Sequence, residues 1–376
     1  MTLLDVQKAF DSVDHEMLCE KIRQAGIEPT WFKSYLSNRT QVVSLNNNCS
    51  TERVICTGVP QGSILGPWCF LLYSNDLHAC TSCKVLTYAD DTVLLVSNRC
   101  LHIVSQQLSS ELTNCFHWLT NNHMSMHMGK TEVIVFSSRR KRHLAKNFVI
   151  SCQGQQIFAK PEVKYLGLKL DSILSGNSIV DNIVSKSTSR LKFLYRHANC
   201  LDQKSRKTLV SALIQSYFDY NAPAWYDGIT KRCKSKLQVI QNKLVRFILN
   251  LGPRSHIGQA ELDQLNLLNT SDRVKQLALN HMFNIYHESA PRYLTDGFTR
   301  AVSQHSHATR GAELGFVVHR FDGLSRFNFS SYGAKLWNSI PCDIRRVSDR
   351  SSYKKRVKLY LQKHSLSEEQ MDYVFY

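Results

Sequence analysis

Two adjacent carboxylates interrupt an apolar stretch that is otherwise typical of β-strands. Residues 85–96 run Val-Leu-Thr-Tyr-Ala-Asp-Asp-Thr-Val-Leu-Leu-Val, with Asp90 and Asp91 at the centre. A carboxylate on a half-buried strand is costly to desolvate, and two neighbouring carboxylates repel each other unless a cation lies between them. The pattern predicts a hairpin whose turn carries a cation site. An acidic turn without any function would also explain this pair taken alone.

A third acid supports the cation site. Asp5 follows the short apolar run of Leu3 and Leu4, so it also lies at the end of an expected strand. Three acids at two strand ends offer hard oxygen ligands of the kind that Mg²⁺ prefers, and this ion keeps its waters and bridges substrate phosphates. We therefore expect the strand that leads to Asp5 to lie beside the 85–96 hairpin, although 85 residues separate Asp5 from Asp90.

Composition limits the class of protein. The chain has 376 residues, of which 43% are hydrophobic and 10% aromatic, which is typical of a globular protein with two or more domains. It contains no apolar run of the roughly 18 residues that a membrane span needs, so we expect no membrane partner. The 12 cysteines are scattered without the spacing of a zinc site. We expect reduced thiols in an intracellular protein, located in the nucleus and cytoplasm.

Positive charge is concentrated in the second half of the chain. The formal net charge is +17, yet residues 1–174 carry 17 Lys and Arg against 14 Asp and Glu, whereas residues 175–376 carry 30 against 16. A basic half behind an acidic metal site indicates a polyanion held beside the chemistry. A solvated basic surface is the alternative, and the four-residue run Arg139–Arg142 is more typical of a solvated loop than of a nuclear signal.

Hydrophobic periodicity predicts an α+β fold followed by a mostly helical region. We expect one sheet backed by helices, with strands at 3–6, 42–45, 53–56, 85–96, 132–136, 148–151 and 164–170 and helices at 13–25, 27–36, up to 75 and 103–119. Beyond a boundary near residue 175 we expect helices at 179–200, 204–222, 232–251 and 273–287, loops over 295–330 and a last helix at 351–363. The corresponding domains are 1–174, 175–294 and 295–376.

Three further features suit a nucleotide site, although each has an ordinary alternative. Phe10 lies five residues after Asp5, where its ring would pack under a sugar and clash with a 2′-hydroxyl, or would simply be a core residue. Gln61 and Gly62 belong to the loop 58–63, whose glycines permit close approach to a base pair or phosphate, or only form a turn. Lys130 follows a glycine and could face a pyrophosphate group, or be an ordinary surface lysine.

Taken together, the ordered motifs resemble those of reverse transcriptases from non-LTR retrotransposons, in the jockey-like and chicken-repeat-type branch. They are Asp5-Val-Gln-Lys-Ala-Phe-Asp-Ser-Val-Asp-His15, Trp31-Phe-Lys-Ser-Tyr-Leu-Ser-Asn-Arg39, Gly58-Val-Pro-Gln-Gly-Ser-Ile-Leu-Gly-Pro67, Tyr88-Ala-Asp-Asp91, Gly129-Lys-Thr131 and Tyr165-Leu-Gly167. The tail is also similar to that branch at Ser289–Leu294, His305–Arg310 and Gly333–Pro341.

The resemblance implies a palm-type polymerase sheet followed by a helical thumb-like region and a tail. It assigns metal binding to Asp5, Asp90, Asp91 and the Val6 carbonyl, with two Mg²⁺ ions, or Mn²⁺ in their place, about 3.5–4 Å apart. Asp5 and Asp90 would share the ion at the primer 3′-hydroxyl, and Asp91 would support them. The remaining assignments are a sugar gate at Phe10, contacts to the nascent pair at Gln61 and Gly62, a triphosphate contact at Lys130 and a primer grip at Tyr165, Leu166 and Gly167.

The implied partners are an RNA template, a DNA primer and deoxynucleoside triphosphates, and the oligomeric state stays open. In the resembling family a fingers region precedes the first aspartate, whereas only Met1–Leu4 do so here. We therefore expect a chain without the fingers and endonuclease regions, which binds nucleic acid but polymerises poorly. A catalytically inactive binding remnant is the alternative. An RNA-templated RNA polymerase is a further alternative, against which Phe10 argues.

Overall fold

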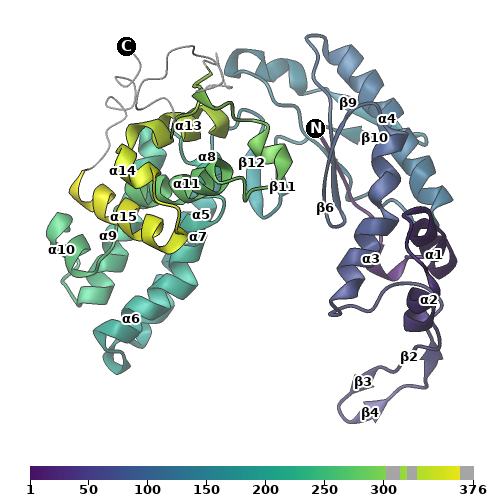
Figure 1. The fold of residues 1–376 in the computed structure, drawn as a ribbon, viewed down its shortest axis with the longest axis horizontal. Coiled ribbons are helices and arrows are strands. Elements are labelled where there is room, and N and C mark those ends of the chain that lie inside the picture. The colour runs from purple at the N-terminus through teal and green to yellow at the C-terminus, as the bar shows by residue number, and fades with distance from the viewer. Residues whose placement is uncertain (302–313, 320–327, 365–376) are drawn as a thin grey trace. The chain divides into compact units, whose positions relative to one another are not determined.

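The computed structural model describes residues 1–301, 314–319 and 328–364. The chain divides into two compact units, Met1–Ile173 and Leu174–Tyr376, next to the boundary near residue 175 that the sequence pattern predicts. The first unit mixes helices and strands and the second is helical (Figure 1), so the predicted α+β composition is confirmed. The tail motif His305–Arg310 lies outside the described residues. Among the described residues, no helix is long and apolar enough to cross a membrane.

A four-stranded antiparallel sheet forms the centre of the first unit. Its strands lie in the order β6 (Lys84–Tyr88), β7 (Asp91–Leu95), β1 (Thr2–Leu4) and β8 (Glu132–Val133). Strands β6 and β7 form the expected hairpin, in which Tyr88 pairs with Asp91. Strand β1 pairs with β7 in the register Leu4↔Thr92 and Leu3↔Val93. The prediction that the strand leading to Asp5 lies beside the 85–96 hairpin is therefore confirmed.

One face of this sheet is packed against helices. Leu4, Leu94 and Val133 are 0–3% exposed and belong to one core with apolar side chains of α4 (Leu101–Asn121), α1 (His15–Gln24) and α3 (Leu65–Tyr73). Helix α4 confirms the predicted helix 103–119. Its apolar residues recur every three or four positions, so one face of the helix packs against the core. Helix α1 begins at His15 because the Asp14 carboxylate accepts a hydrogen bond from the Met17 N–H (2.9 Å). A short 3₁₀ turn, η2 (Asn75–Cys80), follows α3.

Two predicted strands lie outside the central sheet, which corrects the expectation of one sheet. Strand β9 (Val149–Cys152) pairs with β10 (Gln155–Phe158), and β11 (Glu162–Tyr165) pairs with β12 (Leu168–Asp171). Two-residue loops with positive φ, Gln153-Gly154 and Leu166-Gly167, close each pair into its own hairpin. Each strand therefore finds its partner locally. The basic run lies in a 3₁₀ segment, η3 (Arg139–Ala145).

The segment 40–54 forms an exposed arm. The two predicted strands 42–45 and 53–56 flank a turn signal, but they do not pair with each other. Strand β2 (Thr40–Gln41) pairs with β5 (Arg53–Val54), and β3 (Ser44–Leu45) pairs with β4 (Asn48–Cys49). Asn46 and Asn47 both have positive φ, so the inner pair turns tightly within two residues. Every strand residue of the arm is exposed, and Figure 1 shows the arm extending from the side of α2 (Thr30–Leu36).

The loop after the arm packs closely on the segment that follows Asp5. Gly58 N donates to the Val13 carbonyl (2.7 Å), and Val59 N donates to the carbonyl of Phe10 in the short turn η1 (Ala9–Asp11) at 2.8 Å. Gly58 has φ +89°, and a Cβ built on it would lie 2.8 Å from the Asp11 Cα. Only glycine fits this position, because both the left-handed conformation and the close backbone contact exclude a side chain.

The second unit is built from helices of unequal length. They are α5 (Asn177–Arg196), α6 (Gln203–Val210), α7 (Ser216–Asp219), α8 (Ala222–Trp225), α9 (Lys231–Leu249), α10 (Gln259–Gln264), α11 (Thr270–Tyr286), α12 (Arg292–Thr295), α13 (Phe329–Ser339), α14 (Cys342–Arg345) and α15 (Arg350–Lys363). The predicted helix 204–222 is interrupted, because a π turn at Ser211–Gln215 joins α6 to α7. A 3₁₀ turn, η4 (Ala198–Cys200), follows α5.

The described part of the predicted tail packs into this helical unit. Trp337 of α13 and Tyr353 of α15 are fully buried in one core with Leu279 and Phe283 of α11. The sequence pattern does not predict α13, because a glycine and three serines lower the helix propensity of the segment. Gly333 gives room at this crossing, since a Cβ there would lie 2.6 Å from the Met282 Sδ and the Met282 side chain would have to shift.

The contact of Gly58 with Asp11 predicts a large difference between two glycine substitutions. Gly58→Ala should lower the free energy of unfolding by more than the ~1 kcal/mol of left-handed strain, because the Cβ meets backbone that cannot move. Gly154→Ala is the control, since Gly154 has φ +76° but open space around its Cβ position. Denaturant unfolding of both variants measures the difference, and equal losses would contradict the close contact.

Candidate active site

The strand register brings two of the three predicted acids together. Leu4 pairs with Thr92, so the next residues along the two antiparallel strands, Asp5 and Asp91, lie opposite each other. Opposed residues of an antiparallel pair share one face of the sheet, and successive residues alternate between faces. Asp5 and Asp91 therefore lie on the face away from the core residues Leu4 and Leu94. Asp90 precedes Asp91 in the hairpin loop.

The acids interact electrostatically. Burial raises the pKa of Asp91 above its ordinary value, and the charges of Asp90 and Asp5 raise the pKa further. Asp91 and Asp90 nevertheless remain exposed, while Asp5 is half-buried. Like charges held this close favour a proton or a cation between them.

The Val6 carbonyl points toward the side of the hairpin that carries the acids. Gln7 N donates to the Ser125 carbonyl and His127 N donates to the Asp5 carbonyl, both at 2.8 Å, around the antiparallel bridge Val6↔Met126. In such a bridge, the N–H and C=O of the central residue point away from the partner segment. Since Met126 lies on one side of Val6, the Val6 carbonyl points to the opposite side, where β1 is flanked by β7. Among the described residues, no donor reaches this carbonyl oxygen.

These groups fit a magnesium ion by donor type, but they do not form a closed cage. Within residues 1–301, 314–319 and 328–364, no three His, Cys, Asp or Glu side chains are gathered in a way that could hold a metal ion. Mg²⁺ does not need such a cage, because proteins hold it through one or two carboxylates while waters and substrate phosphates complete the shell. Asp5, Asp91 and the Val6 carbonyl offer hard oxygen atoms of this kind.

Phe10 and the loop with Gln61 meet at the turn η1. Phe10 is half-buried, with its ring centroid 4.7 Å from that of Phe70. Gln61 Nε2 donates to Asp11 Oδ1 (2.9 Å), which fixes the orientation of the amide. Gly62 has φ +80° and open space around its Cβ position. The packing of Phe10 is compatible with a core role and with a sugar contact at its exposed edge.

The remaining predicted residues belong to turns. Lys130 is exposed in a turn that begins at His127, whose N–H is bonded to Asp5. Tyr165 precedes the two-residue loop Leu166-Gly167 between β11 and β12. Burial raises the pKa of the Tyr165 hydroxyl, and the charge of Asp91 raises it further, so this hairpin lies within electrostatic reach of the acids.

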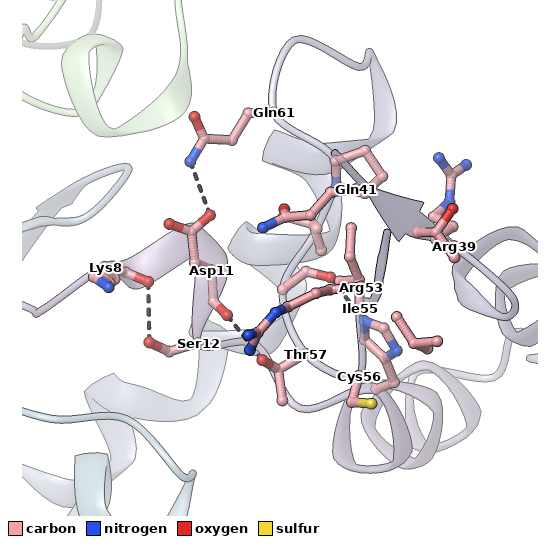
Figure 2. Close-up of a pocket in the computed structure, with 16 residues that line it drawn as sticks. Lys8, Asp11, Ser12, Arg39, Gln41, Arg53, Ile55, Cys56, Thr57 and Gln61 are labelled. Carbon is pink, nitrogen blue, oxygen red and sulfur yellow. Dashed lines mark hydrogen bonds between the residues drawn. The ribbon is translucent and has the colours of Figure 1, made fainter. Parts of the chain in front are cut away.

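A polar hollow of about 970 Å³ was not predicted from the sequence. It lies where the arm meets the 57–61 loop, and its walls include Lys8, Asp11, Arg39, Gln41, Arg53 and Gln61. Figure 2 shows Gln41 and Arg53 extending from the arm toward the side that holds Asp11. No local pattern could identify these residues, because the arm pairing that brings them together was itself not predictable. Gln61 alone belongs to both the predicted set and the hollow.

Comparisons with known proteins show what the first unit is similar to. Residues 1–170 match the family model described as reverse transcriptase (RNA-dependent DNA polymerase). A probable RNA-directed DNA polymerase from transposon BS of Drosophila melanogaster is 31% identical, over 65% of this chain and 28% of that protein. The RNA-directed DNA polymerase from mobile element jockey of the same organism is 26% identical, over 77% of this chain and 33% of that protein.

The matched part of each relative is small, because the chain covers only about a third of their length or less. A probable RNA-directed DNA polymerase from the X-element, also of Drosophila melanogaster, is 26% identical over 65% of this chain. The resemblance that the ordered motifs indicate is confirmed by these matches. Residues 1–170 therefore match the reverse transcriptase family, and the chain is similar to RNA-directed DNA polymerases of transposable elements.

Proposed function

We propose that the chain is an RNA-directed DNA polymerase that extends a DNA primer on an RNA template with deoxynucleoside triphosphates. The feature that supports this proposal is the register of β1 with β7, which leads to Asp5 and Asp91 on the sheet face away from the helical core, together with the influence of the Asp90 and Asp5 charges on Asp91. Such a cluster suits phosphoryl transfer, which depends on positioning and charge neutralisation rather than on covalent chemistry by the protein. The alternative of an inactive binding remnant is not favoured, because all three acids are retained.

We assign metal binding to Asp5, Asp90, Asp91 and the Val6 carbonyl. When bound, two Mg²⁺ ions would activate the primer 3′-hydroxyl and neutralise the charge of the pyrophosphate that leaves. The motif order favours Asp90 as the main partner of Asp5, whereas the strand register favours Asp91. In either case the carboxylates would hold the metal ions and so orient the reacting groups.

The other residues would hold the substrates in place. Phe10 would exclude a 2′-hydroxyl, and the amide of Gln61, oriented by Asp11, would contact the nascent pair beside Gly62. Lys130 would contribute positive charge at the triphosphate. Tyr165, Leu166 and Gly167 would contact the primer strand, and the electrostatic influence of Asp91 on Tyr165 supports this assignment.

The second unit would bind the template–primer duplex. Helix α5 carries the exposed cations Arg190 and Lys192 together with the exposed rings of Phe193 (51%) and Tyr195 (50%). Cations on one helix suit contact with phosphates rather than the reading of bases. We therefore assign a thumb-like role to residues 175–294.

The raised pKa of Asp91 predicts opposite effects of one substitution with and without metal. Folding disfavours the charged form of Asp91, so the metal-free chain should become more stable as the pH falls through this pKa. Asp91→Asn should lack this pH dependence and melt higher than the wild type at neutral pH. In Mg²⁺ or Mn²⁺ the same variant should lose the stabilisation that metal gives, and primer extension should fall on the order of 10³-fold or more.

Thermal melts across pH, with and without metal, and extension of a primed RNA measure these effects. Asp90→Asn in parallel tests whether Asp90 or Asp91 is the main partner of Asp5. Glu16→Gln removes an exposed carboxylate elsewhere in the first unit and should change neither the metal response nor activity. Metal stabilisation that survives Asp5→Asn and Asp91→Asn would refute the site.

The sugar-gate assignment predicts a change in selectivity rather than in activity. Phe10→Val should raise ribonucleotide incorporation by one to two orders of magnitude, since a contact removed at one methylene-sized site is worth about 1–3 kcal/mol. Deoxyribonucleotide use should change little. Phe70→Leu is the control, because it removes the same ring contact from the core side. An equal shift in selectivity in both variants would indicate that Phe10 acts only as a core residue.

The thumb-like assignment predicts that duplex binding depends strongly on salt. Affinity for primed RNA should fall steeply with salt and vary little with sequence. The combined change Arg190→Gln and Lys192→Gln should reduce the slope of log K against log[salt] by about two. Lys236→Gln is the control, because this lysine is already paired with Asp181 at 2.7 Å. A slope that the double variant leaves unchanged would argue against the assignment.

A further inference from the structure

A stack of two rings lies on helix α2, with an exposed tryptophan next to a half-buried tyrosine. Trp31 and Tyr35 lie one turn apart, with ring centroids 5.5 Å apart and an angle of 6° between the rings. The Arg39 guanidinium lies over the Tyr35 ring, 4.5 Å from its centroid. Trp31 is 56% exposed. We call Trp31, Tyr35 and Arg39 the α2 stack.

Arg39 is held in place by its own backbone turn. Asn38 adopts the left-handed conformation (φ 53°) after the end of α2, and Arg39 Nε donates to the Tyr35 carbonyl at 2.6 Å. Among the described residues, no carboxylate pairs with Arg39. Its terminal nitrogens are therefore available in a fixed planar group, which suits a phosphate.

The α2 stack leads into the polar hollow, because Arg39 belongs to both. The hollow adds the cations Lys8 and Arg53, and neither forms an ion pair with any described residue. Its single acid, Asp11, is engaged by the Gln61 amide. Figure 2 places Gln61 and Asp11 on the side of the hollow across from Arg39. The cations outnumber the acid, so the hollow attracts a polyanion.

Folding alone does not account for this surface. A ring pair on a helix surface stabilises the helix by only about 0.2–0.5 kcal/mol, and here it leaves a tryptophan mostly in water. A flat exposed ring such as that of Trp31, next to unpaired cations, is the combination with which proteins bind single-stranded nucleic acid. A duplex cannot use the rings, because its bases are already stacked. The unpaired cations also favour a strand of phosphates over an apolar protein segment.

We propose that the α2 stack and the hollow form one path for an unpaired nucleic-acid strand. Its bases stack on Trp31, and its phosphates bind Arg39 and Arg53. This inference rests on the proposed function, because the strand is the unpaired RNA template on its way to Gln61. It extends that function by naming a surface that none of the ordered motifs assigns to template contact.

The test measures binding of a fluorescein-labelled oligouridylate to the full chain by fluorescence anisotropy. Trp31→Ala should weaken binding about tenfold, the value of one lost base–ring stack, and Trp31→Leu should weaken it equally. Trp31→Phe should restore most of the affinity. Arg39→Gln should weaken binding and reduce its salt slope by about one. Phe158→Ala, which removes a ring that is 62% exposed elsewhere in the first unit, should have no effect.

Blunt RNA–DNA duplex binding is measured in parallel and should not depend on Trp31. Wild-type affinity in Trp31→Leu would overturn the proposal, because an apolar contact would then suffice. A change in sedimentation of the chain without a change in oligouridylate binding would also overturn it in favour of a protein contact. Loss confined to oligodeoxythymidylate would overturn the assignment to template.

Primer extension by the wild-type chain separates this inference from the proposed function. Trp31-dependent binding of oligouridylate in a chain that extends no primer would refute the polymerase proposal and leave the strand path standing. Primer extension by a chain in which neither Trp31 nor Arg39 affects oligouridylate binding would refute the strand path and leave the polymerase proposal standing.

Discussion

The antiparallel pairing of β1 with β7 is the interaction on which the candidate site depends. It joins two segments that are far apart in the chain, and its register sets Asp5 opposite Asp91. A shift by one residue would move Asp5 out of line with Asp91, and would turn Leu4 out of the core, because side chains alternate between the faces of a sheet. The packing of Leu4 and Leu94 against the helices therefore fixes the position of the acids as well as the stability of the sheet.

Local strain accompanies this arrangement. Lys8, Ala89 and Leu166 all have φ between 44° and 53°, and each lies within two residues of a predicted site residue. Residues other than glycine adopt this conformation at a cost on the order of 1 kcal/mol or more, and they keep it only where the surroundings enforce it. Here the sheet, the docked 57–60 loop and the β11–β12 hairpin supply that enforcement, so the backbone around the acids is set before any substrate arrives.

Prediction from sequence succeeded where the signal was local. The Asp90-Asp91 hairpin and helix α4 both follow from residues within one turn or one strand. Among the longer-range choices, the placement of β1 beside the 85–96 hairpin was predicted correctly, but the pairing of the shorter strands was not. The arm and the β9–β10 hairpin have short strands whose pairing is decided by turn residues such as Asn46 and Gly154, and not by alternation. The hollow and the Gln61–Asp11 contact arise only after those choices, so no pattern in the chain pointed to them.

The π turn at Ser211–Gln215 has a consequence for how this segment is compared with its relatives. The buried residues Arg206, Val210, Ile214 and Phe218 recur at every fourth position, a spacing that an unbroken α-helix would carry progressively around its axis. The wider turn absorbs part of that drift. Removing one residue there would rotate Phe218 by about 100° away from the core. The number of residues in this segment therefore determines which side chains face the core. An alignment that closes a one-residue gap at this point would superimpose core positions on surface ones.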